Sequence, residues 1–161
     1  MNKAYLLIGG NEGDRLQYLH QAVKDINHSC GSVVCQSSVY ETAAWGKTDQ
    51  QAFLNQALEI DTPLPAEDLL QAVLAVETYL GRIREERYGP RVIDIDIIFF
   101  NDTVIRQPQL LVPHPEVQHR RFALVPLQEI APRLVHPVLH KTISELLADC
   151  PDPLPVQLYQ P

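Results

Sequence analysis

The stretch over residues 92–100 limits what this chain can fold into more than any other. Its middle, residues 93–97, reads Ile-Asp-Ile-Asp-Ile, and its flanks are rich in β-branched and aromatic residues. Successive side chains of a strand point to opposite faces, so the isoleucines share one face while Asp94 and Asp96 share the other. We therefore expect a strand with one face on a hydrophobic core and one polar face.

Asp94 and Asp96 are candidate metal ligands. Two carboxylates on one covered face repel each other, and a divalent cation removes that repulsion. Ligands that are all oxygen, with room for water and phosphate oxygens, favour Mg²⁺ over zinc. The alternative is a half-exposed strand with two solvated aspartates, which is a common arrangement. The neighbouring sequence decides between these two interpretations.

An arginine-rich stretch comes directly before the acidic strand. Residues 82–91 contain four arginines and two glutamates, and the flanking and internal glycines disfavour regular structure. Guanidinium groups bind phosphate oxygens bidentately, and a loop can close over a polyphosphate and exclude water. An isolated run of this kind would be a solvated loop whose arginines pair with its own glutamates. Beside a candidate Mg²⁺ site it indicates phosphoryl transfer instead.

The net charge narrows the class of partner. The chain has 13 Lys and Arg against 20 Asp and Glu, a formal net charge of −7 at pH 7. We expect no nucleic-acid partner, which would need a positive field, although the arginine-rich stretch suits an anionic small ligand. No apolar run approaches the roughly 18 residues of a membrane span, and Cys30, Cys35 and Cys150 lack metal-type spacing. We expect a cytoplasmic protein with reduced thiols and no membrane partner.

The order of the predicted elements indicates the fold class. Apolar spacings of three and four predict helices over residues 16–26 and 69–80, and apolar runs predict strands over 4–8, 33–40, 53–60 and 92–100. The order β-α-β-β-α-β is the split βαβ, or ferredoxin-like, pattern of an α+β fold. A length of 161 residues fits a single domain over 1–161.

The C-terminal third is rich in proline. Ten of the thirteen prolines lie between Pro108 and Pro161, so we expect few long regular elements there. We predict a short helix around residues 142–148 and otherwise an irregular, Pro-rich extension that packs on the same domain. The last segment, 151–161, is expected to be loosely held.

Other residues are candidates for ligand contacts. Phe53 and Asn55 share a strand face, and with Trp45 and Phe122 they offer aromatic planes beside an amide, which suits a flat heterocycle. Each aromatic residue taken alone is more often part of a core. Glu77 lies on the apolar face of its predicted helix, an unusual place for a carboxylate unless it reaches a ligand or a partner. The glycines near residue 10 do not complete a P-loop.

Residues 89–97 resemble a known signature. They read Gly-Pro-Arg-Val-Ile-Asp-Ile-Asp-Ile, similar to the pattern G-P-R-x-x-D-[LI]-D-[LI] of the 6-hydroxymethyl-7,8-dihydropterin pyrophosphokinase family. The resemblance implies an enzyme of folate biosynthesis that transfers the pyrophosphoryl group of ATP to the pterin hydroxymethyl group and releases AMP. We expect a monomer. Further matches follow in order and spacing between residues 4 and 135, among them the segments 8–11, 37–42, 53–55, 112–114 and 126–132.

The resemblance implies a role for each matching residue. Two Mg²⁺ ions would be bound by Asp94 and Asp96 and would bridge the ATP phosphates, which Arg82 and Arg91 would hold and neutralise in catalysis. The residues implied in ATP contacts are Glu77, Arg84, Ile97, His114 and Arg120. Those implied in pterin recognition are Thr42, Ala44, Trp45, Phe53, Asn55 and Phe122, with the pterin stacked between the two phenylalanines.

Several residues depart from the commonest pattern of the family. Tyr88 stands where tryptophan is frequent, and Trp45 stands at an often aliphatic position. Positions that carry polar or aromatic ATP contacts in some members are here Leu74, Gln109, Leu111 and Pro115. The Mg²⁺ and pterin sites therefore carry over more directly than the nucleotide contacts.

Two other functions fit the same residues. A metal-dependent nucleotidyltransferase or phosphohydrolase would use Asp94 and Asp96 and would turn over nucleotide without any pterin. A regulatory module of ferredoxin-like fold would bind a ligand without chemistry. The arginine-rich stretch beside two aspartates counts against the regulatory module.

Overall fold

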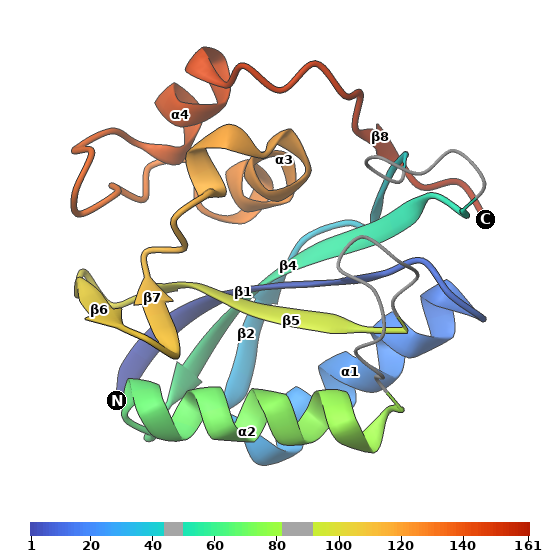
Figure 1. Cartoon of the computed structure of the whole chain (residues 1–161), viewed down its shortest axis with the longest axis horizontal. Coiled ribbons are helices and arrows are strands. Elements are labelled where there is room, and N and C mark those ends of the chain that lie inside the picture. The colour runs from blue at the N-terminus through green and yellow to red at the C-terminus, as the bar shows by residue number, and fades with distance from the viewer. Residues whose placement is uncertain (44–49, 82–91) are drawn as a thin grey trace.

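The computed structural model describes residues 1–43, 50–81 and 92–161, which form a mixed α/β fold. An antiparallel sheet (Figure 1) has the strand order β5 (Asp94–Phe100), β1 (Asn2–Gly10), β4 (Phe53–Thr62), β3 (Tyr40–Thr42) and β8 (Gln157–Leu158). Strand β2 (Ser32–Gln36) also pairs with β4, and β6 (Ile105–Gln107) forms a separate hairpin with β7 (Leu110–Val112). The helices are α1 (Arg15–Ser29), α2 (Ala66–Tyr79), α3 (Arg121–Ile130) and α4 (Ile143–Asp149), and a 3-10 turn, η1, spans Val117–His119.

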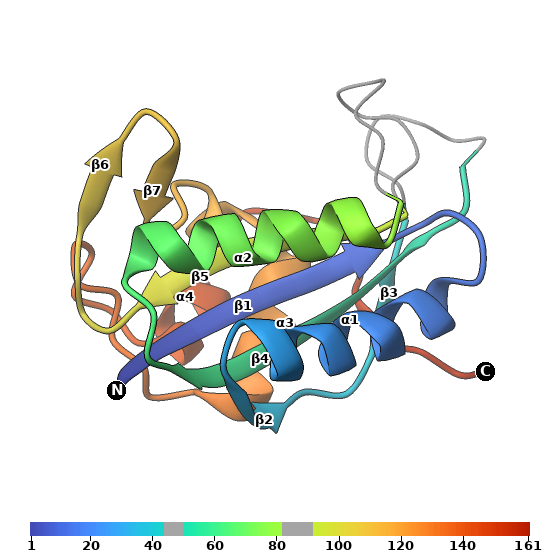
Figure 2. The same cartoon turned by 90° about the horizontal axis from the view of Figure 1, so that it is seen from below.

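Helices α1 and α2 cover one face of the sheet (Figures 1 and 2). Between them and the sheet lies a core in which Ile8, Leu58 and Leu69 have no exposed surface. Both helices begin where the sequence carries start signals, because the Asp14 side chain caps the first turn of α1 and Pro65 precedes α2. The predicted helices are thus confirmed, with longer bounds than the apolar spacing alone suggests.

Helices α3 and α4 lie over the opposite face of the sheet (Figure 1). They form a second core in which Ala57 and Phe99 of the sheet pack with Leu124 and Leu127 of α3. Leu7 of β1 belongs to this core and also lines the pocket described below. One face of the sheet is therefore covered by two helices, and the other is shared between a core and a pocket.

The helix α3 corrects the prediction of irregular chain in the proline-rich third. It spans ten residues and contains Pro126 in its interior. A proline inside a helix costs about 3 kcal/mol, because it removes one backbone hydrogen bond and crowds the preceding turn. Full burial of Leu124 and Leu127 offsets this cost, at about 1.5–3 kcal/mol for each side chain. The number of prolines was therefore a poor guide to helix content here.

The predicted strand over residues 33–40 is divided into β2 and β3. Both pair with β4, and the residues between them leave the regular ladder at Ser37. The Ser37 N–H donates to the Ala57 carbonyl at 2.9 Å, and the Ser37 hydroxyl accepts from the Ala57 N–H at 2.9 Å. The Gln56 side chain donates to the Ser37 carbonyl at 2.7 Å. Side-chain hydrogen bonds thus replace the ladder at the break, which an apolar pattern does not reveal.

The C-terminal segment returns to the sheet. Strand β8 pairs with β3, and the Tyr159 N–H donates to the Val39 carbonyl at 2.9 Å. The Arg15 guanidinium stacks over the Tyr159 ring at 5.5 Å from its centroid. No helix in the described ranges is long and apolar enough to cross a membrane.

Candidate active site

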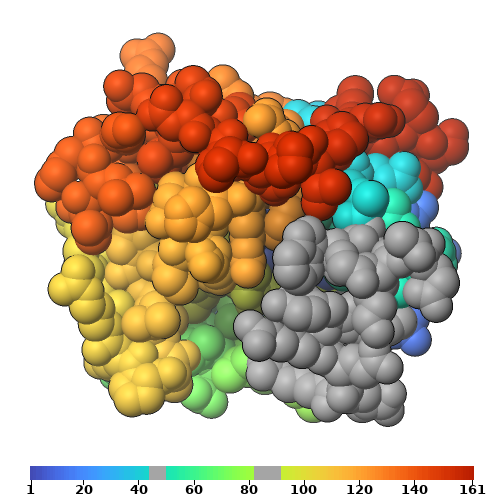
Figure 3. Space-filling model, turned by 45° about the horizontal axis from the view of Figure 1, so that its top comes forward, coloured from blue at the N-terminus to red at the C-terminus, as the bar shows by residue number. Residues whose placement is uncertain are grey.

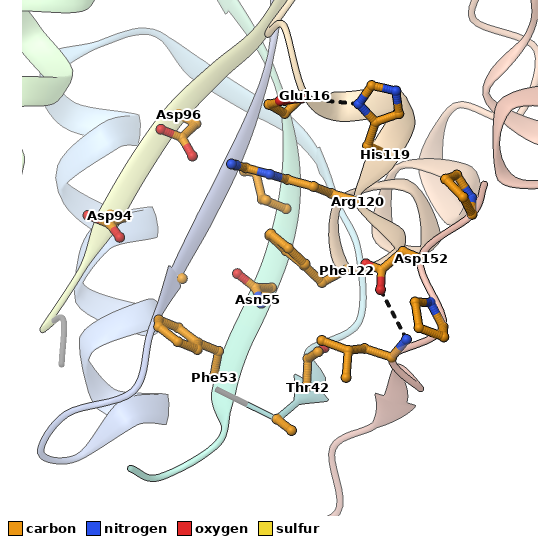
Figure 4. A pocket seen from close by; sticks show the side chains of 16 residues that line it. Thr42, Phe53, Asn55, Asp94, Asp96, Glu116, His119, Arg120, Phe122 and Asp152 are labelled. Carbon is orange, nitrogen blue, oxygen red and sulfur yellow. Dashed lines mark hydrogen bonds and ion pairs between the residues drawn. The ribbon is translucent and has the colours of Figure 1, made fainter. Parts of the chain in front are cut away.

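A pocket of about 710 Å³ opens over the part of the sheet that α3 and α4 leave uncovered (Figure 4). It is bordered by β1, β3, β4 and β5 from the sheet, by the turn into α3, and by the chain after α4. Ten of its residues are labelled in Figure 4: Thr42, Phe53, Asn55, Asp94, Asp96, Glu116, His119, Arg120, Phe122 and Asp152. Seven of these were predicted site residues, drawn from four separate parts of the sequence.

The strand register places the predicted residues side by side. Gly9 of β1 pairs with Asp94 of β5 on one side and with Asn55 of β4 on the other. Paired residues of antiparallel strands lie on the same face of the sheet, so these three residues form one row facing the pocket. Leu7 pairs with Asp96 in the next row. The two aspartates therefore share one face, as their alternation predicts, and we call them the acidic wall.

Gly9 allows the row to close up. A Cβ atom at this position would lie 2.1 Å from Asn55 Oδ1 and 2.9 Å from the Leu54 carbonyl oxygen. No real side chain tolerates such a contact, so the Asn55 side chain occupies the space that only glycine leaves open. This packing positions the Asn55 side chain, and the residue is only 6% exposed. Figure 4 shows it between Phe53 and Phe122.

Four residues form the other side of the pocket, and we call them the aromatic wall: Thr42, Phe53, Asn55 and Phe122. Figure 4 shows Phe53 and Phe122 on either side of Asn55, with Thr42 below them. The Thr42 hydroxyl is buried and finds no hydrogen-bond partner among the described residues. A buried polar atom without a partner costs free energy, so a ligand with a polar edge would be stabilised here.

Arg120 connects the two walls. It lies between η1 and α3, in an extended conformation with φ −123° and ψ 102°. Its guanidinium lies 5.7 Å from the centroid of the Phe122 ring and extends across the pocket toward Asp96 (Figure 4). A cation placed between a carboxylate wall and an aromatic ring is suited to an anionic group that bridges the two sides.

Comparison with known proteins assigns the chain to a family. Residues 5–132 match the family model of 7,8-dihydro-6-hydroxymethylpterin-pyrophosphokinase (HPPK). The chain belongs to the HPPK family. It is 46% identical over 149 residues to a 2-amino-4-hydroxy-6-hydroxymethyldihydropteridine pyrophosphokinase of Methylorubrum extorquens, covering 92% of this chain and 93% of that protein. It is 48% identical over 130 residues to the enzyme of the same name from Bacillus subtilis, covering 80% and 78%.

Solved structures with the HPPK fold agree at low sequence identity. A chain of Plasmodium falciparum HPPK-DHPS superposes with a TM-score of 0.75 at 19% identity, and a wild-type form of that protein with 0.73 at 18%. Each covers 92% of this chain, whereas this chain spans only 43% of each solved chain. At this identity the likeness shows the fold, namely an antiparallel sheet with helices on its faces.

In this HPPK chain, Glu77 lies beside the acidic wall rather than in the pocket. Its side chain is 5% exposed, and its Oε2 atom accepts a hydrogen bond of 2.6 Å from the Ile95 N–H. Ile95 lies between Asp94 and Asp96 on β5, an edge strand whose inner side pairs with β1. Glu77 therefore holds the backbone that carries both aspartates. The unusual place of this carboxylate, noted from the sequence, has a clear structural reason.

Ile97 and His114 also lie outside the main pocket. The Ile97 side chain is in the core beneath α2, on the face of β5 opposite to the aspartates. The His114 Nδ1 accepts from the Glu116 N–H at 3.1 Å, which leaves the proton of a neutral ring on Nε2. Burial, reinforced by the positive charge of Arg120, lowers the pKa of His114 to about 4. His114 lines a smaller cavity of about 280 Å³ beside the β6–β7 hairpin.

Several lining residues of the HPPK pocket were not predicted. The exposed side chains of Glu116 and His119 contact each other at 3.1 Å, and residues 151–154 line the pocket after α4. Gly9 carried a signal, since a glycine inside a predicted strand often marks a close approach. No comparable signal marked the others. The predicted residues Ala44, Trp45, Arg82, Arg84 and Arg91 lie outside the described ranges.

Proposed function

We propose that this HPPK-family chain transfers the pyrophosphoryl group of ATP to the hydroxymethyl group of 6-hydroxymethyl-7,8-dihydropterin and releases AMP, a step in folate synthesis. The observation that carries the proposal is the row of Asp94, Gly9 and Asn55, which joins the acidic wall to the aromatic wall in one pocket. Phosphoryl transfer needs charge neutralisation and positioning more than covalent chemistry. Such a pocket would hold the phosphates of ATP beside the hydroxymethyl group of the pterin.

The aromatic wall is proposed to bind the pterin. The ring would stack between Phe53 and Phe122. The Asn55 amide and the Thr42 hydroxyl, which has no partner among the described residues, would hydrogen-bond its polar edge. Ala44 and Trp45 are proposed to complete this side by family resemblance. The bound hydroxymethyl group would then face the acidic wall, where the phosphates of ATP are expected.

The acidic wall is proposed to hold two Mg²⁺ ions. The donor set fits, because Asp94 and Asp96 supply only oxygen and their wall lies on a pocket open to water and phosphate. Within the described ranges no group of three or more His, Cys, Asp or Glu side chains is arranged to hold a metal ion, so phosphate oxygens and water would have to complete the shell of each ion. When bound, Mg²⁺ neutralises charge on the phosphates.

The chain's own residues would then position the reacting groups. Arg120 would attract the phosphates from the turn before α3, and Arg82, Arg84 and Arg91 are proposed to do so by family resemblance. The pterin hydroxyl oxygen would attack the β-phosphorus and lose its proton to solvent. The bond from the β-phosphorus to the oxygen that bridges it to the α-phosphorus would break, and AMP would leave with that oxygen. Alignment of these groups in one pocket supplies an entropic advantage.

The nucleotide contacts follow from where the side chains lie. Ile97 is proposed to reach ATP through its backbone, because its side chain is in the core. His114 would donate from Nε2, since Nδ1 is already occupied by the Glu116 N–H. Glu77 would affect ATP binding indirectly, because it holds the β5 backbone that carries Asp94 and Asp96. These residues are the ones that the family resemblance implies in ATP contacts, and the proposal states which atoms of each would act.

We also propose that the core is ferredoxin-like. In the order β1-α1-β2-β4-α2-β5, the strands lie as β5-β1-β4-β2 and both helices cover one face. This antiparallel arrangement is what a split βαβ motif requires. We treat residues 1–161 as one domain with a Pro-rich C-terminal extension, acting as a cytoplasmic monomer without nucleic-acid or membrane partners.

The reaction is tested by incubating the protein with ATP, Mg²⁺ and 6-hydroxymethyl-7,8-dihydropterin and separating the nucleotides. We expect AMP and the pterin diphosphate in equal amounts, and neither product when EDTA is present. Release of ADP, or nucleotide turnover without pterin, would favour a phosphohydrolase or nucleotidyltransferase. Binding of both ligands without any product would favour a regulatory module.

A further inference from the structure

The chain after α4 closes one side of the pocket, and we call residues 151–159 the C-terminal strap. Its first part, residues 151–154, lines the pocket, and its last part contains β8, which pairs with β3. In the space-filling view (Figure 3) the strap, in red, runs across the molecule over α3 toward β3. The match to the HPPK family model ends at residue 132, so this segment lies outside the matched residues.

Asp152 connects the strap to the start of α3. Its Oδ2 atom accepts from the Arg121 N–H at 3.1 Å, its Oδ1 atom accepts from the Leu154 N–H at 3.0 Å, and its carbonyl oxygen accepts from Arg121 Nε at 3.1 Å. Arg120, the N-cap residue just before Arg121, makes no capping hydrogen bond with its own side chain within the described structure. Asp152 thus caps α3 from 31 residues away along the chain.

The capped residue lies between two residues of the pocket. Arg121 begins α3, and its neighbours Arg120 and Phe122 both line the cavity. A carboxylate at a helix N-terminus also meets the positive end of the helix dipole, which strengthens the contact. Figure 4 shows Asp152 beside Phe122, on the side of the pocket that faces the acidic wall. Because Phe122 directly follows Arg121, a shift of the Arg121 backbone would also move Phe122.

The far end of the strap is held as well. Beyond the pairing with β3, the Tyr159 N–H donates to the Val39 carbonyl, and the Tyr159 ring lies under the Arg15 guanidinium. Arg15 also forms an ion pair of 2.7 Å with Glu41 in β3. The strap is therefore fixed to α3 through Asp152, within the part that lines the pocket, and to the sheet edge beyond it.

We propose that Asp152 is a positioning residue for the pterin side of the pocket. It holds the start of α3 so that Phe122 faces Phe53, and it holds residues 151–154 as a wall that limits which pterin substituents fit. The role depends on the proposed pterin site and extends it to a segment outside the family-model match. The position of the Arg120 guanidinium depends less on the contact between Asp152 and Arg121. Its long side chain can compensate for a small backbone shift, whereas a stacked ring such as Phe122 cannot.

The test compares Asp152→Ala with Asp152→Asn and with a matched control, Asp149→Ala. Asp149 is an exposed residue of α4 that pairs with Lys141 at 2.9 Å and does not line the pocket. Loss of a charged cap predicts that Asp152→Ala raises the KM for the pterin about tenfold, with the KM for ATP changing less than about threefold. Asp152→Asn keeps an acceptor for the Arg121 N–H, so it should remain within about threefold of the wild type.

A pterin KM for Asp152→Ala equal to that of the wild type would overturn the proposal. So would equal effects of Asp152→Ala and Asp149→Ala, because the strap would then act only on stability. If Asp152→Ala does not fold, Leu154→Ala decides in its place: a raised pterin KM supports the wall and an unchanged one refutes it. Absence of AMP formation by the wild type would instead refute the proposed function, so the two failures are distinguishable.

Discussion

The two walls of the pocket are built in different ways. The acidic wall belongs to a single strand, so the alternation of residues 93–97 is enough to place both aspartates on one face. The aromatic wall combines residues of β3, β4 and α3, from Thr42 to Phe122 in the sequence. It depends on the packing that holds α3 above the sheet. We therefore expect changes in the acidic wall to act on chemistry, and changes in the aromatic wall to act on pterin binding.

The largest effect is expected for Asp96→Ala. Removing one of two proposed Mg²⁺ ligands should lower kcat on the order of 10³-fold, because charge on the phosphates is no longer neutralised. Asp96 is half-buried on an edge strand, so the free energy of unfolding should change by less than about 1 kcal/mol. Steady-state AMP formation and urea unfolding measure the two effects.

Asp102→Ala is the matched control for this change. Asp102 is exposed in the turn after β5 and does not line the pocket, so its loss should leave kcat unchanged. If Asp96→Ala kept wild-type turnover, or raised only the KM for the pterin, the division of labour between the two walls would be wrong.

A smaller effect is expected for Gly9→Ala, which tests where the two walls meet. The added Cβ would lie 2.1 Å from Asn55 Oδ1, so the Asn55 amide must move. We expect a loss of about 1–3 kcal/mol in the free energy of unfolding from overpacking, together with a rise of about tenfold in the pterin KM from the lost amide contact. The KM for ATP should stay near its wild-type value.

Gly31→Ala is the matched control, because it introduces a similar steric clash outside the pocket. A Cβ at Gly31 would lie 2.4 Å from the Asp61 carbonyl oxygen, and neither Gly31 nor Asp61 lines the pocket. It should lower stability to a similar extent without changing the pterin KM. A pterin KM raised equally by both substitutions would show that Gly9 matters only for folding.

The difference between a wall built from one strand and a wall built from several elements also explains which features the sequence could predict. The acidic strand, both early helices and the amide–aromatic pair of β4 follow local periods, and each was predicted with nearly the right bounds. The division of the strand at Ser37 and the helix around Pro126 depend on side-chain hydrogen bonds and on burial against other elements. The strap is invisible to local patterns, because Asp152 acts on a helix 31 residues earlier.

Glu77→Ala tests whether the acidic wall needs support from α2. The Ile95 N–H would lose the carboxylate that accepts its 2.6 Å hydrogen bond. We expect this loss to lower the free energy of unfolding by about 2 kcal/mol and to lower kcat several-fold. Glu77→Gln keeps an acceptor and should be milder in both measurements. A raised KM for ATP with unchanged stability in Glu77→Ala would instead show that Glu77 contacts the nucleotide and does not support the strand.

The smallest effect concerns His114, in the segment that leads to Arg120. Burial lowers its pKa in the folded protein to about 4, from an ordinary value of 6.5. Well above pH 6.5 the ring is neutral in both states, so His114 contributes little pH dependence there. As the pH falls from 6.5 toward 4, the unfolded chain binds a proton that the folded protein does not, and stability is lost.

This difference in proton binding predicts a loss of about 1 kcal/mol at pH 5.5 relative to pH 7.5 from His114. Urea unfolding of the wild type and of His114→Gln at both pH values measures it, because His136, whose pKa burial also lowers, is present in both proteins. The variant should lose less stability on acidification than the wild type. Equal losses would mean that His114 accepts a proton in the folded state, and that the segment leading to Arg120 is open to solvent.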